Sequence, residues 1–119
     1  MLYHNILVWK KAHEFTLQIY LITKKYPKDE LFGIVSQMRR ASSSVPANIV
    51  EGNARRSNKE FAQFLVQARG SLSETQYFLE LSKDLEYISK IEYESLTELS
   101  IEVAKMLNSL LTKVKSSSY

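Results

Sequence analysis

Apolar residues recur every three or four positions along almost the whole chain, and this spacing constrains the fold more than any other feature. Such spacing places side chains on one face of a helix, whereas a half-buried strand would need strict alternation. Short breaks interrupt the pattern near residues 27–28, 54–57 and 86–89. The pattern therefore predicts helices over about residues 6–26, 29–53, 58–85 and 90–115.

The breaks carry ordinary signals of helix ends. Tyr26 precedes a proline, and a residue in that position avoids the α region. Residues 57–60 and 89–92 both read Ser-x-x-Glu, which fits a capping box in which the serine and the glutamate each satisfy a free backbone N–H. Short connections make consecutive helices antiparallel neighbours. The sequence thus predicts one all-α domain over residues 1–119, an antiparallel up-down-up-down four-helix bundle.

Several classes of function are disfavoured by what the chain contains. It has no cysteine and 2 histidines, His4 and His13, and neither histidine sits in a Glu-x-x-His or His-Glu-x-x-His arrangement. There is no glycine-rich phosphate loop, and the serines at 42–44 have no activating base nearby in sequence except Glu51. We therefore expect no metal, no cofactor and no enzymatic activity. The start of the chain lacks a signal peptide and no apolar run is long enough for a membrane span, so we expect a cytoplasmic protein with no membrane partner.

A proline inside the second predicted helix needs an explanation, because an interior proline costs roughly 3 kcal/mol. Pro46 leaves the carbonyl of Ser42 without its helical donor, and we expect neighbouring serine hydroxyls or water to satisfy it. The sequence predicts a helix that is bent at Pro46 and carries a polar face. The proposed structural polar motif comprises Ser44, Pro46, Asn48, Glu51 and Gly52. Asn48 and Glu51 are three positions apart and can meet side by side, holding the bend or a subunit contact.

Positive charge is concentrated in the first part of the chain, although the net charge is only +3. The candidate nucleic-acid-binding residues are Arg39, Arg40, Arg55, Arg56, Lys59 and Arg69. Between residues 39 and 69 the acidic side chains are those of Glu51 and Glu60. Guanidinium groups suit phosphate because their planar donors bind it in a bidentate way. The alternative is that Arg40 or Arg55 pairs with Glu51 and simply solvates the helix.

Some apolar residues lie off the main stripes of the predicted helices. They are Trp9, Leu17, Tyr20, Leu21, Phe64, Tyr77, Phe78, Leu81, Ile101, Ala104, Leu107 and Leu111. A wide core-facing stripe would accommodate them, as globular helices require. A second buried face, made by self-association, would accommodate them equally well.

Several separated motifs carry a resemblance to a known family. They are Gln-x-Arg-Arg-Ala at 37–41, Pro-Ala-Asn-Ile-x-Glu-Gly at 46–52, Arg-Arg-Ser at 55–57, and the aromatic pair Phe61 and Phe64. In this order they resemble the four-helix-bundle proteins encoded in intervening sequences of bacterial 23S rRNA genes. The chain is also similar to the accessory proteins of diversity-generating retroelements, which are basic pentameric bundles associated with reverse transcriptase and nucleic acid.

The resemblance implies a homo-oligomer, specifically a homopentamer, with no established catalytic activity. Together with the arginines it leads to one hypothesis: a non-enzymatic, self-associating bundle that binds nucleic acid, with RNA favoured over DNA. Because no aromatic platform for bases is evident, such binding would be largely independent of sequence. The alternative hypothesis is a protein–protein interaction scaffold with no nucleic-acid ligand.

Overall fold

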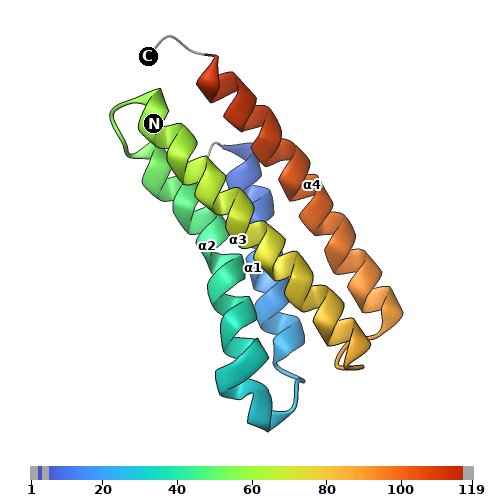
Figure 1. Ribbon diagram of the computed structural model, residues 1–119. Helices are drawn as coiled ribbons and strands as arrows, with labels where there is room; N and C mark the ends of the chain where they lie inside the picture. Colours follow the sequence, from blue (N-terminus) through green and yellow to red (C-terminus); the bar gives the residue numbers. More distant parts are fainter. Residues whose placement is uncertain (1–2, 4–5, 117–119) are drawn as a thin grey trace.

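The computed structural model describes residue 3 and residues 6–116. This part of the chain contains helices and no strand. The elements are α1 (Leu7–Thr23), a short 3₁₀ turn η2 (Lys28–Glu30), a π turn η3 (Leu31–Val35), α2 (Ser36–Asn53), α3 (Asn58–Asp84) and α4 (Lys90–Lys115). They form an elongated bundle of about 48 × 24 × 20 Å (Figure 1). The predicted all-α class and the four long helices are confirmed.

Contacts between neighbouring helices join high residue numbers on one helix to low numbers on the next. Between α1 and α4, Lys25 pairs with Glu92, and Lys11 pairs with Glu102 at 3.3 Å. The same order holds in these further pairs: Thr16 with Ser42, Thr23 with Arg39, Arg40 with Glu74, Met38 with Ser82, Arg69 with Asn108 and Gln76 with Ser100. Consecutive helices therefore run in opposite directions, as Figure 1 also shows.

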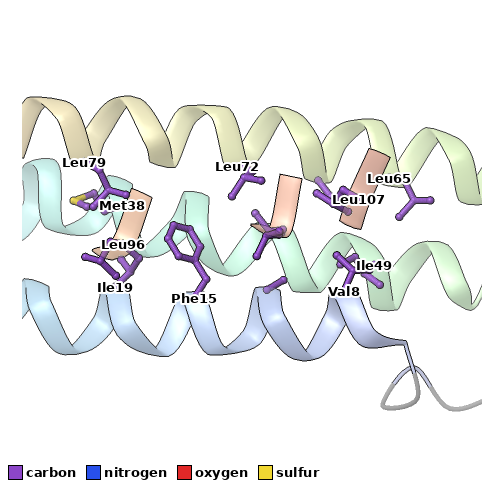
Figure 2. Packing of buried hydrophobic residues seen from close by; sticks show 14 of the residues in the cluster. Val8, Phe15, Ile19, Met38, Ile49, Leu65, Leu72, Leu79, Leu96 and Leu107 are labelled. Carbon is purple, nitrogen blue, oxygen red and sulfur yellow. The ribbon is translucent and has the colours of Figure 1, made fainter. Parts of the chain in front are cut away.

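The core follows the predicted stripes. Figure 2 shows side chains from all four helices packed together in the space between the helices. Among them are Val8, Phe15, Ile19, Met38, Ile49, Leu65, Leu72, Leu79, Leu96 and Leu107. The off-stripe residues divide between the two interpretations. Some widen the core, namely Trp9, Phe78, Leu81, Ala104, Leu107 and Leu111. Others remain exposed, namely Leu17, Tyr20, Leu21, Tyr77 and Ile101.

The two predicted capping boxes differ in detail. Ser89 and Glu92 form the full reciprocal box, with Glu92 N donating to Ser89 Oγ at 3.0 Å and Ser89 N donating to the Glu92 carboxylate at 2.8 Å. Ser57 caps α3, because its Oγ accepts a hydrogen bond from Glu60 N at 3.2 Å. The Glu60 carboxylate, however, accepts from the Ser57 hydroxyl and not from the Ser57 backbone N–H, so the reciprocal half of the box differs. Serine thus begins both helices, since its side chain accepts from an otherwise free N–H.

The start of the second predicted helix is where the expectation was wrong. The sequence predicted a regular helix from residue 29, yet the regular α-helix begins at Ser36. Before it, Gly33 has φ −111° and ψ −116°, which is not helical. A Cβ at Gly33 would lie 2.7 Å from a carboxylate oxygen of Glu30, so the missing side chain lets that carboxylate fold back over the turn. The first helix is also shorter than predicted, ending at Thr23.

The turn between α3 and α4 contains a residue with an unusual backbone. Glu86 has φ +63°, in the left-handed region. Its N–H binds the carbonyl of Lys83, and the N–H of Tyr87 binds the carbonyl of Ser82, both at 2.9 Å. These two bonds define a Schellman motif, in which the left-handed position is usually glycine.

Candidate nucleic-acid interface

The turn that joins α2 to α3, together with the first turn of α3, holds three of the predicted basic residues. Arg55 forms an ion pair with Glu51 at 2.7 Å, and its guanidinium lies 4.8 Å from the centre of the Phe64 ring. Arg56 and Lys59 are exposed, and their side chains make no hydrogen bond or ion pair with any residue that the structure describes. The C-terminus of α2, where the helix dipole is negative, favours the charge of Arg55, whereas Lys59 stands in the first turn of α3, where the dipole is positive.

Arg39 and Arg40 lie near the other end of α2. Arg39 donates from Nε to the Thr23 hydroxyl at 2.9 Å and lies over the Tyr20 ring, on the α1 side. Arg40 pairs with Glu74 of α3 at 2.8 Å. At 1.5 Å per residue, roughly 22 Å of helix axis separates Arg40 from Arg55. The predicted basic residues therefore do not form one continuous patch.

The pairing alternative holds for Arg55, which binds Glu51, whereas Arg40 binds Glu74 instead of Glu51. Arg69, the last candidate, donates to the Asn108 side chain at 3.2 Å across α3 and α4. Both ion pairs are largely exposed, and exposed pairs contribute only about 0–1 kcal/mol. A phosphate group can therefore compete with these carboxylates at little cost.

Folding adds basic residues that the linear charge count missed. Because α4 runs antiparallel to α3, the last turn of α4 lies beside the first turn of α3 (Figure 1). Lys59 and Lys115 line one surface hollow there, together with Val66 and Val114. We call this surface the basic end, made of Arg55, Arg56, Lys59, Lys113 and Lys115. The sequence did contain a signal for them, because Lys113 and Lys115 stand at the end of the fourth predicted helix, which an antiparallel bundle returns to this end.

The opposite end of the bundle has balanced charge. Its turns, residues 24–30 and 83–92, carry Lys24, Lys25, Lys28, Lys83 and Lys90 against Asp29, Glu30, Asp84, Glu86 and Glu92. At the basic end the nearby acidic residues are Glu51 and Glu60. The molecule is therefore electrostatically polar along its long axis, although its net charge is small.

The carbonyl that Pro46 leaves free has a partner, but not one of the predicted serines. The hydroxyl of Thr16, on α1, lies 2.9 Å from the Ser42 carbonyl and 3.0 Å from the Ala12 carbonyl. Thr16 is buried, and Ser42 is fully buried. Sequence reasoning missed Thr16 because it considered only serines of the same helix and water. A threonine on the core-facing stripe of the first helix was the available signal.

The serine hydroxyls instead bind carbonyls of their own helix one turn back. Ser42 donates to the Arg39 carbonyl, whereas Ser43 and Ser44 donate to that of Arg40. The α-helix continues through Pro46 to Asn53 without a non-helical residue, so the irregular backbone of this segment is at Gly33 and the bend at Pro46 stays a prediction.

Asn48 and Glu51 are bonded separately. The Asn48 amide donates to the Ser44 carbonyl at 2.8 Å, and the Glu51 carboxylate binds Arg55. Gly52 is buried inside α2, and a Cβ there would lie 2.8 Å from both the Phe61 ring and the Phe64 Cβ. Within the predicted motif, Gly52 is therefore the residue that lets α2 pack closely on α3.

No other chemical centre emerges in the part of the chain that is described. Among these residues there is no group of three or more His, Cys, Asp or Glu side chains that could hold a metal ion. His13 is exposed and stacks on Trp9, with ring centres 5.0 Å apart. His4 lies outside the described residues. No described helix is long and apolar enough to cross a membrane.

These features define an all-helical bundle protein with one basic end. The sequence belongs to the family of 23S rRNA-intervening sequence proteins, whose model matches residues 4–109. The resemblance carried by the motifs at 37–41 and 46–57 is thereby confirmed.

A solved structure is similar along most of both chains. It is a crystal structure from Bacteroides thetaiotaomicron, described as a protein with unknown function from the S23 ribosomal protein family. The two chains are 33% identical with a TM-score of 0.79, and the match covers 87% of this chain and 97% of the other. No curated protein matches the sequence. The family and its fold are thus established, and neither points to an enzymatic activity.

Proposed function

We propose that the protein is a non-enzymatic, self-associating bundle, a homopentamer, that binds nucleic acid through its basic end, with RNA favoured over DNA. The observation that carries the proposal is the gathering of Arg55, Arg56, Lys59, Lys113 and Lys115 at one end of the molecule, while the other end is balanced. Such asymmetry steers a polyanion toward one surface. Arg39, Arg40 and Arg69 lie outside this surface and are secondary contacts.

Arg56 and Lys59 are the principal phosphate ligands in this proposal. They are exposed and unpaired among the described residues, so binding phosphate breaks no existing contact. Arg55 is held beside them by the Phe64 ring and can exchange Glu51 for a phosphate. Neutralised phosphates release counterions, which makes the affinity depend steeply on salt. An oligomer repeats the basic end and multiplies weak contacts into useful affinity.

The test is fluorescence anisotropy with a structured RNA and a DNA duplex over a range of salt concentrations. The variant Arg56→Gln/Lys59→Gln removes two unpaired charges from the basic end. The matched control, Lys24→Gln/Lys28→Gln, removes two exposed charges from the opposite end. The slope of log affinity against log salt concentration is negative, and we expect the first pair to reduce its magnitude. The reduction should be up to about 0.9 per lost phosphate contact on duplex, or about 0.7 on single strands, and the control should leave the slope unchanged. Equal effects of the two variants would refute the basic end as the binding surface.

A protein–protein scaffold is the second candidate, and the exposed apolar side chains favour it. Leu7, Leu17, Leu21 and Ile101 are each at least 45% exposed. A scaffold predicts that the intact oligomer fails to bind RNA or DNA even at low salt. It also predicts that the basic-end variant loses assembly or an acidic protein partner.

A further inference from the structure

The turn between α1 and α2 presents an aromatic side chain to solvent. Phe32 is 92% exposed and its neighbour Leu31 is 48% exposed, whereas the next two residues, Ile34 and Val35 after Gly33, are buried. Glu30, just before this pair, accepts a hydrogen bond from the Tyr87 hydroxyl at 2.7 Å. The turn is therefore anchored on both sides of Phe32, which forms a fixed apolar knob instead of the tip of a free loop.

A hollow that can receive such a knob lies between α1 and α4. It is lined by Leu21, Ile22, Ile91 and Leu96, with the Lys25–Glu92 ion pair on its rim. Leu21 is 57% exposed and Ile91 is 79% exposed. We call it the Leu21–Ile91 groove. Large apolar side chains left in water on both an anchored turn and a groove indicate a surface that is covered in the working protein.

The knob and the groove lie at the same end of the bundle. Phe32 is in η3, within the turn between α1 and α2, Leu21 is in the last turn of α1 and Ile91 is in the first turn of α4. Figure 1 shows the α1–α2 turn and the start of α4 at the same end of the bundle. The two surfaces differ in the sign of their net charge. Before the knob, Lys28 stands against Asp29 and Glu30, whereas Lys25 and Lys90 outnumber Glu92 at the groove. One chain therefore carries two different surfaces that fit each other on separate copies.

We propose that Phe32 of one copy inserts into the Leu21–Ile91 groove of a second copy, so that the knob of each subunit contacts the groove of the next. This inference rests on the proposed self-association and names the surfaces that produce it. A contact between two different surfaces is heterologous, and it closes into a ring when the rotation between subunits allows. Because knob and groove share one end, the joined subunits can lie side by side with their long axes in the same sense. All basic ends then face the same side of the assembly.

The area of the knob sets its role within the interface. A buried phenylalanine contributes about 150–250 Å², whereas a standard interface buries about 800 Å² per partner. Phe32 is therefore an anchor, and exposed residues along α1 such as Leu17 supply further area. Central aromatic anchors are typical hot spots, so Phe32→Ser is expected to weaken association about 30-fold or more.

The test uses two variants that complement each other. Phe32→Ser removes the knob and leaves the groove, whereas Ile91→Asp spoils the groove and leaves the knob. Both residues are exposed, so neither change should unfold the subunit, which circular dichroism and a thermal melt verify. Tyr77→Ser is the matched control, because Tyr77 is an exposed aromatic on α3 that neither lines the groove nor belongs to the turn that carries Phe32. Mass is measured by sedimentation velocity over a range of concentrations.

We expect the wild type and Tyr77→Ser to form the oligomer and each interface variant to be monomeric. An equal mixture of the two variants retains one intact knob and one intact groove per pair, so it should form a heterodimer and nothing larger. If the wild type is monomeric, the proposed self-association fails. If the wild type assembles and Phe32→Ser assembles equally well, or if the mixture stays monomeric, the knob-and-groove interface is refuted while self-association stands.

Discussion

The hydrogen bond from Thr16 to the Ser42 carbonyl can be isolated by a double-mutant cycle with Pro46. The change Thr16→Val keeps the shape of the side chain and removes the hydroxyl. In the native sequence the Ser42 carbonyl then loses its donor, since Pro46 has no N–H to offer. The carbonyl is fully buried, so water does not replace the lost partner.

Leaving a buried acceptor unsatisfied costs about 1–3 kcal/mol. The added methyl group of valine offsets a small part of this, so Thr16→Val should lower the free energy of unfolding by about 1–2 kcal/mol. In the Pro46→Ala background the restored N–H at position 46 donates to the Ser42 carbonyl in the ordinary helical way. There Thr16→Val should cost less than about 0.5 kcal/mol. The expected coupling energy is therefore about 1 kcal/mol or more.

Urea unfolding followed by circular dichroism measures all four proteins of the cycle. The protein concentration must be the same throughout, because association would add to apparent stability. Pro46→Ala has further effects, including the space left by a smaller buried side chain, but these appear on both sides of the cycle and cancel. If Thr16→Val is equally destabilising in both backgrounds, the hydroxyl does not serve the carbonyl that proline frees, and the reasoning is wrong.

Four further changes test local features of the fold. Gly52→Ala should destabilise the protein by about 1–2 kcal/mol, because overpacking against α3 exceeds the gain in helix propensity. Gly70→Ala, with nothing within 4 Å of its added Cβ, should stabilise it by about 0.5–1 kcal/mol. Thermal melts measure both changes. Glu86→Gly should stabilise by about 1 kcal/mol, since glycine accepts the left-handed backbone without the Cβ clash, and an unchanged melting temperature would contradict this. The pKa of Glu92 is lowered, first by the hydrogen bond from Lys25 and then by the Ser89 N–H, so its stabilisation is present above its unfolded pKa and is lost as pH falls through the lower folded pKa. Glu92→Gln should therefore flatten the loss of stability below about pH 4.5, measured as the urea midpoint against pH, and an unaltered profile would count against the assignment.

Helix number and most helix boundaries followed from local patterns. Stripes spaced by three and four residues predicted the faces that now contain Phe15, Met38 and Leu72, because burying one face is the main source of stability for a helix. Ser57 and Ser89 were identified as helix starts, since capping depends on residues only three positions apart. Family motifs in one stretch were enough to indicate the family.

Other features depended on contacts between segments far apart in the chain. Thr16 serves the carbonyl freed by Pro46 only because α1 packs against α2, and no periodicity in either helix specifies that partner. Lys113 and Lys115 join Arg56 at the basic end because an antiparallel bundle returns the end of α4 to the α2–α3 turn. The irregular backbone at Gly33 likewise lies beside a Glu30 carboxylate that accepts a hydrogen bond from Tyr87, which belongs to the distant α3–α4 turn. Local sequence decides which residues form helices, whereas the charge of a surface and the partner of a buried carbonyl depend on how those helices pack together.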